Sequence, residues 1–256
     1  MRLLASLLTV ALLLGTAAKA EEQIVADLSQ NRVAITANFQ GSQIFIFGAV
    51  KRLSPVPGHY GPLDVVIEVS GPPEPITVRR KERKYGIWVN TDTMTVDRAP
   101  SYYAIASTAP VTEIISEAER LSRSLGLDYA VKILNEAAGE QNSQQFSQAV
   151  VRIRQDSGHY AESERDAKLA EDTLFTAEFQ LPANLTEGDY TARMYLVRDK
   201  RIVNAAEKII TVRKTGMEKW LYDLAHEQPL IYGLLSIAVA LFSGWAASEI
   251  FRRIRR

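Results

Sequence analysis

Cysteine is absent from this sequence of 256 residues. Its absence excludes disulfide bonds, thiolate metal ligands, cysteine nucleophiles and lipid attachment to cysteine. A folded chain without cross-links must be stabilised by its own hydrophobic core. The length is sufficient for one large domain or two small ones.

An excess of charge of one sign is also lacking, because 30 lysines and arginines balance 30 aspartates and glutamates. Bulk electrostatic attraction therefore does not draw the chain towards nucleic acid, and we expect no nucleic-acid partner.

Signatures of catalysis and of metal binding are scarce as well. The nucleophile motifs G-x-S-x-G and S-x-x-K and the phosphate-binding glycine loops do not occur. Gly58-His59-Tyr60 and Gly158-His159-Tyr160 repeat one tripeptide, and two loop histidines with a carboxylate can hold zinc or copper. Their flanks share nothing, so we interpret them as ordinary turn histidines. We expect no catalytic residue, metal or cofactor, and an enzyme of unknown type stays as an alternative.

The longest uncharged run lies near the C-terminus, at residues 230–248 (LIYGLLSIAVALFSGWAAS). As a helix it extends for about 29 Å, close to the ~30 Å hydrocarbon thickness of a bilayer. Arg252, Arg253, Arg255 and Arg256 follow it, and such charges stay on the cytoplasmic side. The sequence predicts one transmembrane helix, a cytoplasmic tail at residues 249–256 and a body on the other side of the membrane.

Residues 1–20 have the pattern of a secretory signal peptide. Arg2 precedes an apolar stretch at residues 3–14, and Ala18-Lys19-Ala20 forms a cleavage site. An uncleaved anchor is the alternative that stays open, and the body lies outside the cytoplasm in either case.

Between these segments, short β-rich runs alternate with turn residues roughly every eight to twelve positions. This spacing predicts a mainly β fold, an immunoglobulin-like β-sandwich whose first part is residues 21–110 and whose closing strands are residues 173–215. Residues 181–190 are typical of the corner before a late strand of such a sandwich, where the Tyr190 hydroxyl can bond back to the corner. One sandwich is favoured over two independent domains, and both interpretations stay open.

The hydrophobic period changes at residues 111–172, which we predict to be a mainly helical insertion. The three expected helices have apolar stripes at Ile114, Ala118, Leu121 and Leu125, at Leu127, Val131, Leu134 and Ala138, and at Phe146, Val150 and Ile153. Residues 160–172 are ambiguous, because their composition is helical although they can lead into a strand. Residues 216–229 form a juxtamembrane segment that either lies against the bilayer or runs straight into the span.

Several stretches together resemble a family of alphaproteobacterial transmembrane proteins that have no established activity. The resemblance rests on residues 78–83 (VRRKER), 86–90 (GIWVN), 100–104 (PSYYA), 181–184 (LPAN) and 220–223 (WLYD). It covers nearly the whole mature chain and implies a Gram-negative source, with the span in the bacterial inner membrane and the body in the periplasm. It also implies an association with a sulfite-exporter-like permease, and it assigns no catalytic residue.

A dense cluster of cations is the strongest polar anomaly in the body. Five cations lie within residues 79–84, and two aromatic residues follow them. The candidate residues for binding an anion or a partner are Arg79, Arg80, Lys81, Arg83, Lys84 and Trp88. An oxyanion, anionic lipid headgroups or an acidic partner would suit them. The alternative is a solvated hairpin tip whose charges prevent edge-to-edge aggregation.

Small residues recur every fourth position in the predicted span, at Ser236, Ala240, Gly244 and Ser248. Such a ridge allows two helix backbones to approach closely in a bilayer, and it predicts a partner helix from a second copy or from a permease. We therefore interpret the chain as a membrane-anchored periplasmic interaction module, an accessory to another membrane protein such as a small-anion transporter. A periplasmic solute-binding or sensing domain is the alternative.

Overall fold

The computed structural model describes residues 22–36, 38–52, 61–131, 140–215 and 217–254. The signal-peptide prediction, His59 and the last two arginines of the tail lie outside the described residues. Strands dominate the body and a long helix closes the chain, so the prediction of a mainly β protein is confirmed. The immunoglobulin-like topology stays a prediction.

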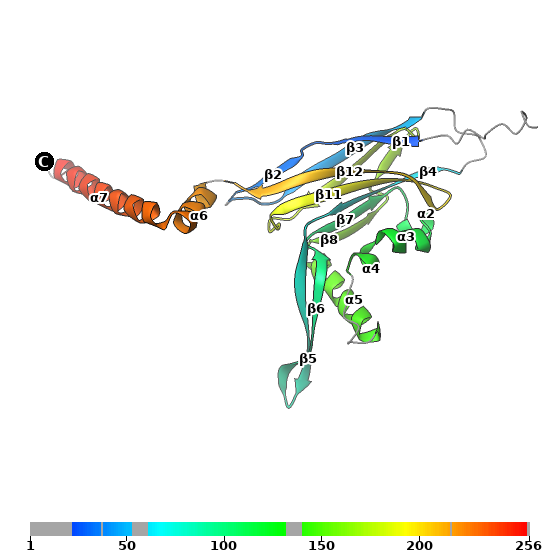
Figure 1. The fold of residues 1–256 in the computed structure, drawn as a ribbon, viewed down its shortest axis with the longest axis horizontal. Helices are drawn as coiled ribbons and strands as arrows, with labels where there is room; N and C mark the ends of the chain where they lie inside the picture. Colours follow the sequence, from blue (N-terminus) through cyan, green and yellow to red (C-terminus); the bar gives the residue numbers. More distant parts are fainter. Residues whose placement is uncertain (1–21, 37, 53–60, 132–139, 216, 255–256) are drawn as a thin grey trace, which may run out of the picture.

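Two sheets form the body (Figure 1). The four-stranded sheet has the order β1 (Glu22–Leu28), β3 (Ser42–Arg52), β10 (Leu174–Leu181) and β9 (Lys168–Ala170). The six-stranded sheet has the order β2 (Arg32–Ile35), β12 (Arg201–Lys214), β11 (Gly188–Arg198), β4 (Leu63–Ser70), β7 (Tyr103–Ser107) and β8 (Tyr160–Glu164). Neighbouring strands are antiparallel except for the pairs β2–β12 and β7–β8.

The main hydrophobic core lies between the two sheets. Strand β10 shows why, because its side chains alternate between exposed and buried and place Phe175, Ala177, Phe179 and Leu181 inside. They pack in one cluster with side chains of the six-stranded sheet such as Ile67 and Met194. The Tyr190 hydroxyl donates a hydrogen bond of 2.9 Å to the Thr186 carbonyl, which confirms the predicted corner contact.

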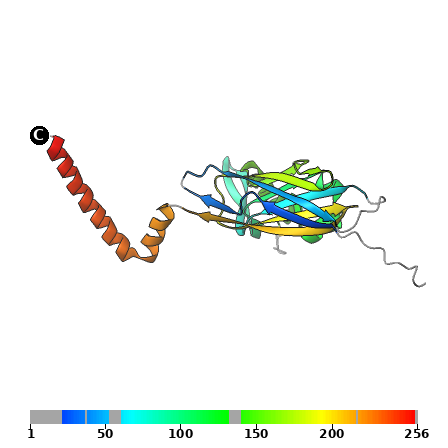
Figure 2. The ribbon, with the colours of Figure 1, turned by 90° about the horizontal axis from the view of Figure 1, so that it is seen from above.

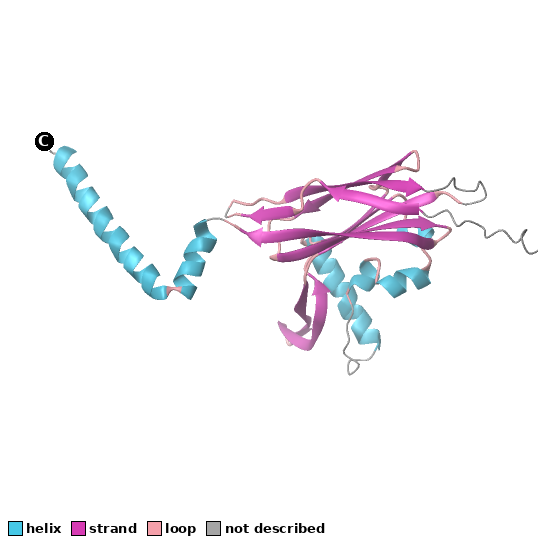
Figure 3. Cartoon of the chain, turned by 45° about the horizontal axis from the view of Figure 1, so that its top comes forward, coloured by secondary structure: helices cyan, strands magenta, loops and turns pink. Residues whose placement is uncertain are grey.

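A second core covers the outer face of the six-stranded sheet, on the side away from the four-stranded sheet. The described helices between β7 and β8 in sequence are α2 (Val111–Ile114), α3 (Glu117–Arg123), α4 (Leu127–Ala130) and α5 (Glu140–Asp156). Residues such as Ile115, Leu125, Phe146 and Val150 pack there against Tyr103 and Tyr195 of the sheet. The body therefore has three layers, with helices on one outer face (Figure 3).

The first predicted helix is wrong as one continuous element. Ile115 is extended, and Ser116 starts a new helix by accepting a hydrogen bond of 3.4 Å from the Glu119 backbone. Ser116 and Glu119 have the spacing of a capping box, which marks a helix start. The break turns Leu121 outwards, so the predicted stripe is not buried as a unit. Leu134 and Ala138 of the second predicted helix lie outside the described residues.

The ambiguous residues 160–172 form strands, so the helical part of the insertion ends at Asp156. Strand β8 pairs along its whole length with β7. The Tyr160 ring is buried, and its hydroxyl donates a hydrogen bond of 2.8 Å to the Pro100 carbonyl. Long-range pairing has overridden the local helical composition.

A long hairpin follows β4 in the chain. Strands β5 (Pro73–Lys84) and β6 (Ile87–Pro100) pair only with each other. Tyr85 and Gly86 form the turn, both with positive φ (52° and 85°), as a two-residue type I′ hairpin requires. The hairpin projects from the body beside the helical layer (Figure 1).

Two helices follow β12 and extend from one end of the sandwich (Figures 1 and 2). Helix α6 (Met217–Glu227) is separated at Gln228 from α7 (Pro229–Ile254). Pro229 explains the break, because proline disfavours the helical conformation of the residue before it. Residues 229–252 are long and apolar enough to cross a membrane, and none of this stretch is buried in the protein. The predicted span at residues 230–248 lies within it.

Candidate binding surfaces

The β5–β6 hairpin, here called the arm, has a packed base and an exposed end. At the base, Val78, Met94, Val96 and Ala99 are buried in the second core. An ion pair between Glu74 and Arg154 of α5 also ties the base to the helical layer. Beyond Val78, β5 contributes no buried side chain, and the exposed residues 81–84 pair with strand β6.

Arg80 differs from the other cations of the predicted cluster. Its guanidinium contacts Asp92 across the hairpin at 3.4 Å and donates a hydrogen bond of 2.6 Å to the Gln145 side chain of α5. The guanidinium also lies over the Phe146 ring, 5.2 Å from its centre. These contacts hold the middle of the arm against α5, which gives Arg80 a structural role.

The remaining candidates lie on the exposed distal half. Arg79, Lys81, Arg83 and Lys84 are all exposed, with Lys84 3.9 Å from Glu82. Trp88 is 68 % exposed and is the cross-strand partner of Arg83. Tyr85 and Ile87 are exposed beside it. The arm therefore ends in an aromatic and aliphatic tip on a cationic stem.

The small-residue ridge of the span lies on α7, where Ser236, Ala240, Gly244 and Ser248 are all exposed. A side chain built at Gly244 meets nothing within 4 Å. The Ser236 hydroxyl donates a hydrogen bond of 2.8 Å to the Tyr232 carbonyl of the preceding turn. Among the described residues the ridge has no helix packed against it.

His159 is buried and has two close neighbours. Its ring nitrogens lie 2.9 Å from the Ser157 hydroxyl and 3.3 Å from the Asn184 carbonyl. Among the described residues, no three histidine, aspartate or glutamate side chains come together as a possible metal site. His159 is therefore a satisfied core residue in this part of the chain.

A row of charged residues crosses the outer face of the six-stranded sheet, and sequence reasoning missed it. Arg193 of β11 is the register partner of Glu68 on β4 and of Glu207 on β12. Its guanidinium lies 3.5 Å from Glu68 and 3.1 Å from Glu207. The one available signal was Glu68 itself, a carboxylate within the apolar strand 63–70 (LDVVIEVS).

Glu68 is the unusual member of this row. It is only 3 % exposed, and its Oε2 atom has no hydrogen-bond partner. Burial raises the pKa of Glu68 from 4.5 to about 7, and Arg193 and Tyr195 offset that effect only in part. Burial and the nearby Glu68 charge also raise the pKa of Tyr195, to about 12.

Two cavities meet around Arg123 and Arg193 on this face. The smaller, about 290 Å³, lies between the base of the arm, the end of α3 and the sheet, and Glu68 lines it. The larger, about 470 Å³, extends over Tyr195, Ala205 and Glu207.

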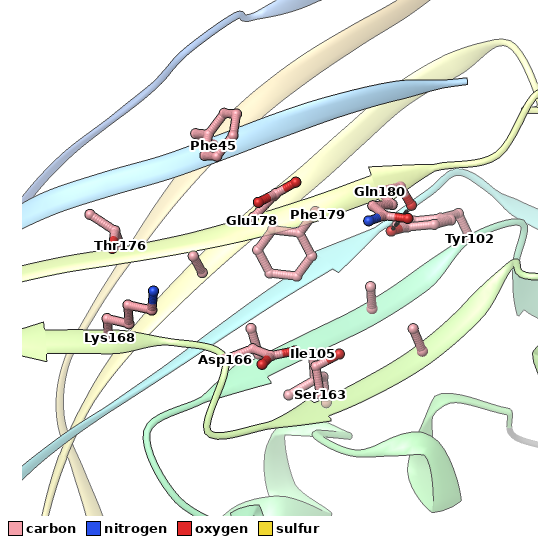
Figure 4. A pocket seen from close by; sticks show the side chains of 14 residues that line it. Phe45, Tyr102, Ile105, Ser163, Asp166, Lys168, Thr176, Glu178, Phe179 and Gln180 are labelled. Atoms are coloured by element: carbon pink, nitrogen blue, oxygen red, sulfur yellow. Dashed lines mark hydrogen bonds between the residues drawn. The ribbon is translucent and has the colours of Figure 1, made fainter. Parts of the chain in front are cut away.

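A further cavity of about 550 Å³ lies at the edge of the sandwich, between β10 and the β7–β8 pair (Figure 4). Small side chains line it at Ala104, Ala106, Ala161 and Ala177, together with Tyr102 and Phe179. The Tyr102 hydroxyl donates a hydrogen bond of 3.0 Å to the Gln180 carbonyl. Strand β9 pairs with β10 only at residues 174–176, which leaves this edge of the sandwich open.

Comparisons with known proteins place the chain among membrane proteins. A family model described as "Putative transmembrane protein (Alph_Pro_TM)" matches residues 23–253. No curated protein matches the chain. Among solved structures, the crystal structure of Spo0M, a sporulation control protein from Bacillus subtilis, matches with 8 % identity and a TM-score of 0.30. The match covers 81 % of this chain and spans 55 % of Spo0M, and at this score it carries no argument.

Proposed function

The chain belongs to the Alph_Pro_TM family of transmembrane proteins, and from this premise we propose that it is a membrane-anchored interaction protein. Its arm binds an acidic surface of another membrane protein. The body lies in the periplasm, and the arginine tail holds the C-terminus in the cytoplasm.

The exposed tip of the arm is the observation that carries this proposal. Trp88 and Arg83 lie opposite each other, beside exposed Tyr85. Tryptophan, tyrosine and arginine are the residue types that dominate binding energy at protein interfaces. A two-stranded hairpin is marginally stable on its own, and Trp88 and Tyr85 bury little apolar surface in the free chain. A contact with a partner gives these side chains a role.

The arrangement of the cations favours a protein surface over a small anion. Arg79, Lys81, Arg83 and Lys84 are spread along a projecting ribbon, and none of the cavities described above is lined by them. A small anion requires donors that converge on one point. An extended row of cations instead complements an extended acidic surface.

The direction of the arm favours a protein over the bilayer surface. In Figures 1 and 3 the arm leaves the body on a different side from the α6–α7 helices. The single span nevertheless keeps the arm near the membrane, within reach of the exposed part of a neighbouring membrane protein.

Photo-crosslinking in native membranes tests the proposal. A photoreactive phenylalanine derivative replaces Trp88 in the full chain, and a matched variant carries it at Leu174, which is exposed to a similar degree on the opposite sheet. We expect the Trp88 position alone to form an adduct with an acidic peptide of another integral membrane protein. Combined Arg79→Glu, Lys81→Glu and Arg83→Glu substitutions should abolish the adduct. Adducts with lipid only, or equal adducts from both positions, would overturn the proposal.

A further inference from the structure

The cavity of about 290 Å³ beside Glu68 is separate from the distal half of the arm and needs an explanation of its own. It lies at the junction of the six-stranded sheet, the end of α3 and the base of the arm. The β4 and β11 strands provide Glu68, Thr191 and Arg193, the end of α3 provides Arg123 and Ser124, and the base of the arm provides Pro73 and Arg98. Small-molecule sites form in such concave junctions, with a few polar groups among apolar ones.

The carboxylate of Glu68 provides an unused acceptor in this cavity. Its Oε2 atom is buried and makes no hydrogen bond. The rest of the carboxylate interacts with the Tyr195 side chain and with Arg193, which lies 3.5 Å from Oε1 and also 3.1 Å from Glu207. A buried polar atom without a hydrogen bond costs free energy, so native proteins rarely leave one unpaired. A ligand that donates a hydrogen bond to Oε2 would remove this cost.

The same cavity also has cations in its lining, and these favour an anionic group on the ligand. Arg98 and Arg123 line it in addition to Arg193. Arg123 is 3.6 Å from Glu119 and lies over the Tyr195 ring. Asp189 is an exposed carboxylate in the same lining, and it is paired with Arg213 at 3.1 Å. The lining therefore presents guanidinium donors suited to a carboxylate or another oxyanion group.

We propose that this cavity binds a small zwitterion of the amino-acid type. Its ammonium group donates to Glu68 Oε2, and its carboxylate contacts Arg98 and Arg123. A purely anionic ligand has no donor for Glu68 and would leave Oε2 unpaired. A purely cationic ligand would be repelled by the arginines. Only a molecule with both charges satisfies both sides of the cavity.

The size and the apolar part of the lining restrict the side chain of the ligand. Pro72, Pro73, Pro100 and Ala130 contribute apolar surface, and about 290 Å³ is at the lower limit of ordinary ligand pockets. The ligand is therefore a small amino acid with a short, apolar or weakly polar side chain. This inference uses residues outside the tip of the arm and can fail independently of the proposed partner contact.

Calorimetric titration of the purified full chain in detergent tests the site directly. The probes are glycine, L-alanine, L-serine and L-proline, with propionate and ethylamine as analogues of alanine that lack one of its two charges. We expect saturable binding of at least one amino acid and at least about tenfold weaker binding of both analogues, as the loss of a charged hydrogen bond implies. Binding of propionate as tightly as alanine, or of none of the amino acids, would refute the zwitterion site.

Three variants connect the binding to these residues. Glu68→Gln and Arg98→Gln should each weaken binding of the best amino acid by about tenfold or more. Glu178→Gln, on the other sheet, is the matched control and should leave binding unchanged. If Glu68→Gln does not fold, the exposed Arg98→Gln still decides the matter. Unchanged affinity in a folded Arg98→Gln or Glu68→Gln protein contradicts the proposal, and the Trp88 crosslink should persist in all three variants.

Discussion

The Arg80 guanidinium donates a hydrogen bond of 2.6 Å to the Gln145 side chain, which joins the arm to helix α5 across 65 residues of sequence. This contact divides the basic cluster into one cation that positions the arm and several that face solvent. Substitution of Arg80 should therefore change the stability of the arm, whereas substitution of an exposed neighbour should not.

Replacing Arg80 with alanine should loosen the arm. The variant loses a charge-assisted hydrogen bond and a cation–π contact, and we expect a loss of about 1–2 kcal/mol in unfolding free energy. Hydrogen exchange at the amides of residues 87–96 should become faster. Arg79→Ala, one position away and exposed, is the control and should change stability by less than about 0.5 kcal/mol. Equal effects in the two variants would contradict the structural role of Arg80.

Glu68 should make the stability of the body depend on pH. Its pKa is about 7 in the folded chain and 4.5 when unburied, so the folded state binds the extra proton between these values. The stability contribution is fully present below pH 4.5 and is lost as pH rises through 7, by roughly 3 kcal/mol in total. Thermal melting of wild type and Glu68→Gln from pH 4.5 to 8 measures this loss. The variant should show a flatter profile over that range.

Other charged and titratable groups surround Glu68 and also affect how the stability of the body depends on pH. The groups facing it from the packed elements are Arg193, Tyr195, Glu207, Tyr103, Arg123 and Arg98. Glu207→Gln is therefore the matched control, because it shares Arg193 but is exposed, and its profile should follow the wild type. An identical pH dependence in Glu68→Gln and wild type would show that Glu68 is not the titrating group.

The arginines after the span predict the orientation of the chain in the membrane. A reporter that is active only in the periplasm should be active when fused after Thr215 and silent when fused after Arg256. The opposite pattern would reverse the proposed orientation. N-terminal sequencing of the same membranes should find Glu21 as the first residue, whereas a peptide that retains Arg2 would identify an uncleaved anchor.

The ridge on α7 predicts association through the span. Gly244→Ile should weaken chemical crosslinking of the span to a partner helix several-fold, because the larger side chain separates the two backbones. Membrane insertion should be unaffected, since isoleucine is fully compatible with lipid and a side chain at Gly244 meets nothing within 4 Å. Leu241→Ile, away from the ridge, is the control. Unchanged association after Gly244→Ile combined with Ala240→Ile would show that the span acts only as a membrane anchor.

Features set by local periodicity could be predicted from the sequence, whereas those set by distant pairing could not. The alternation of β10 and the uncharged run of α7 indicate their structures directly. Strand β8 instead depends on pairing with β7 across the whole helical insertion, so its composition was misleading. The break at Ser116 is a local capping box that the apolar stripe at Ile114 and Leu125 concealed.

The candidate sites divide in the same way. Residues 79–84 attracted attention as a dense run of charge, but the sequence contained no sign that Arg80 would bind α5. Glu68 and Arg193 are 125 residues apart and become neighbours only through the pairing of β4 with β11. A single carboxylate in an apolar strand indicates an unusual position, but it does not identify the cations that surround it.

The parallel pairing of β2 with the end of β12 has a mechanical consequence. Strand β12 ends at Lys214, and α6 and the span follow it in the chain, so a pull of the span on the body is transmitted along β12. Its bonds to β11 on one side run across the strand and are loaded together by such a pull, and β2 holds residues 211–214 on the other side. A pull along β12 would therefore load these hydrogen bonds in shear, at the point where the body is tethered.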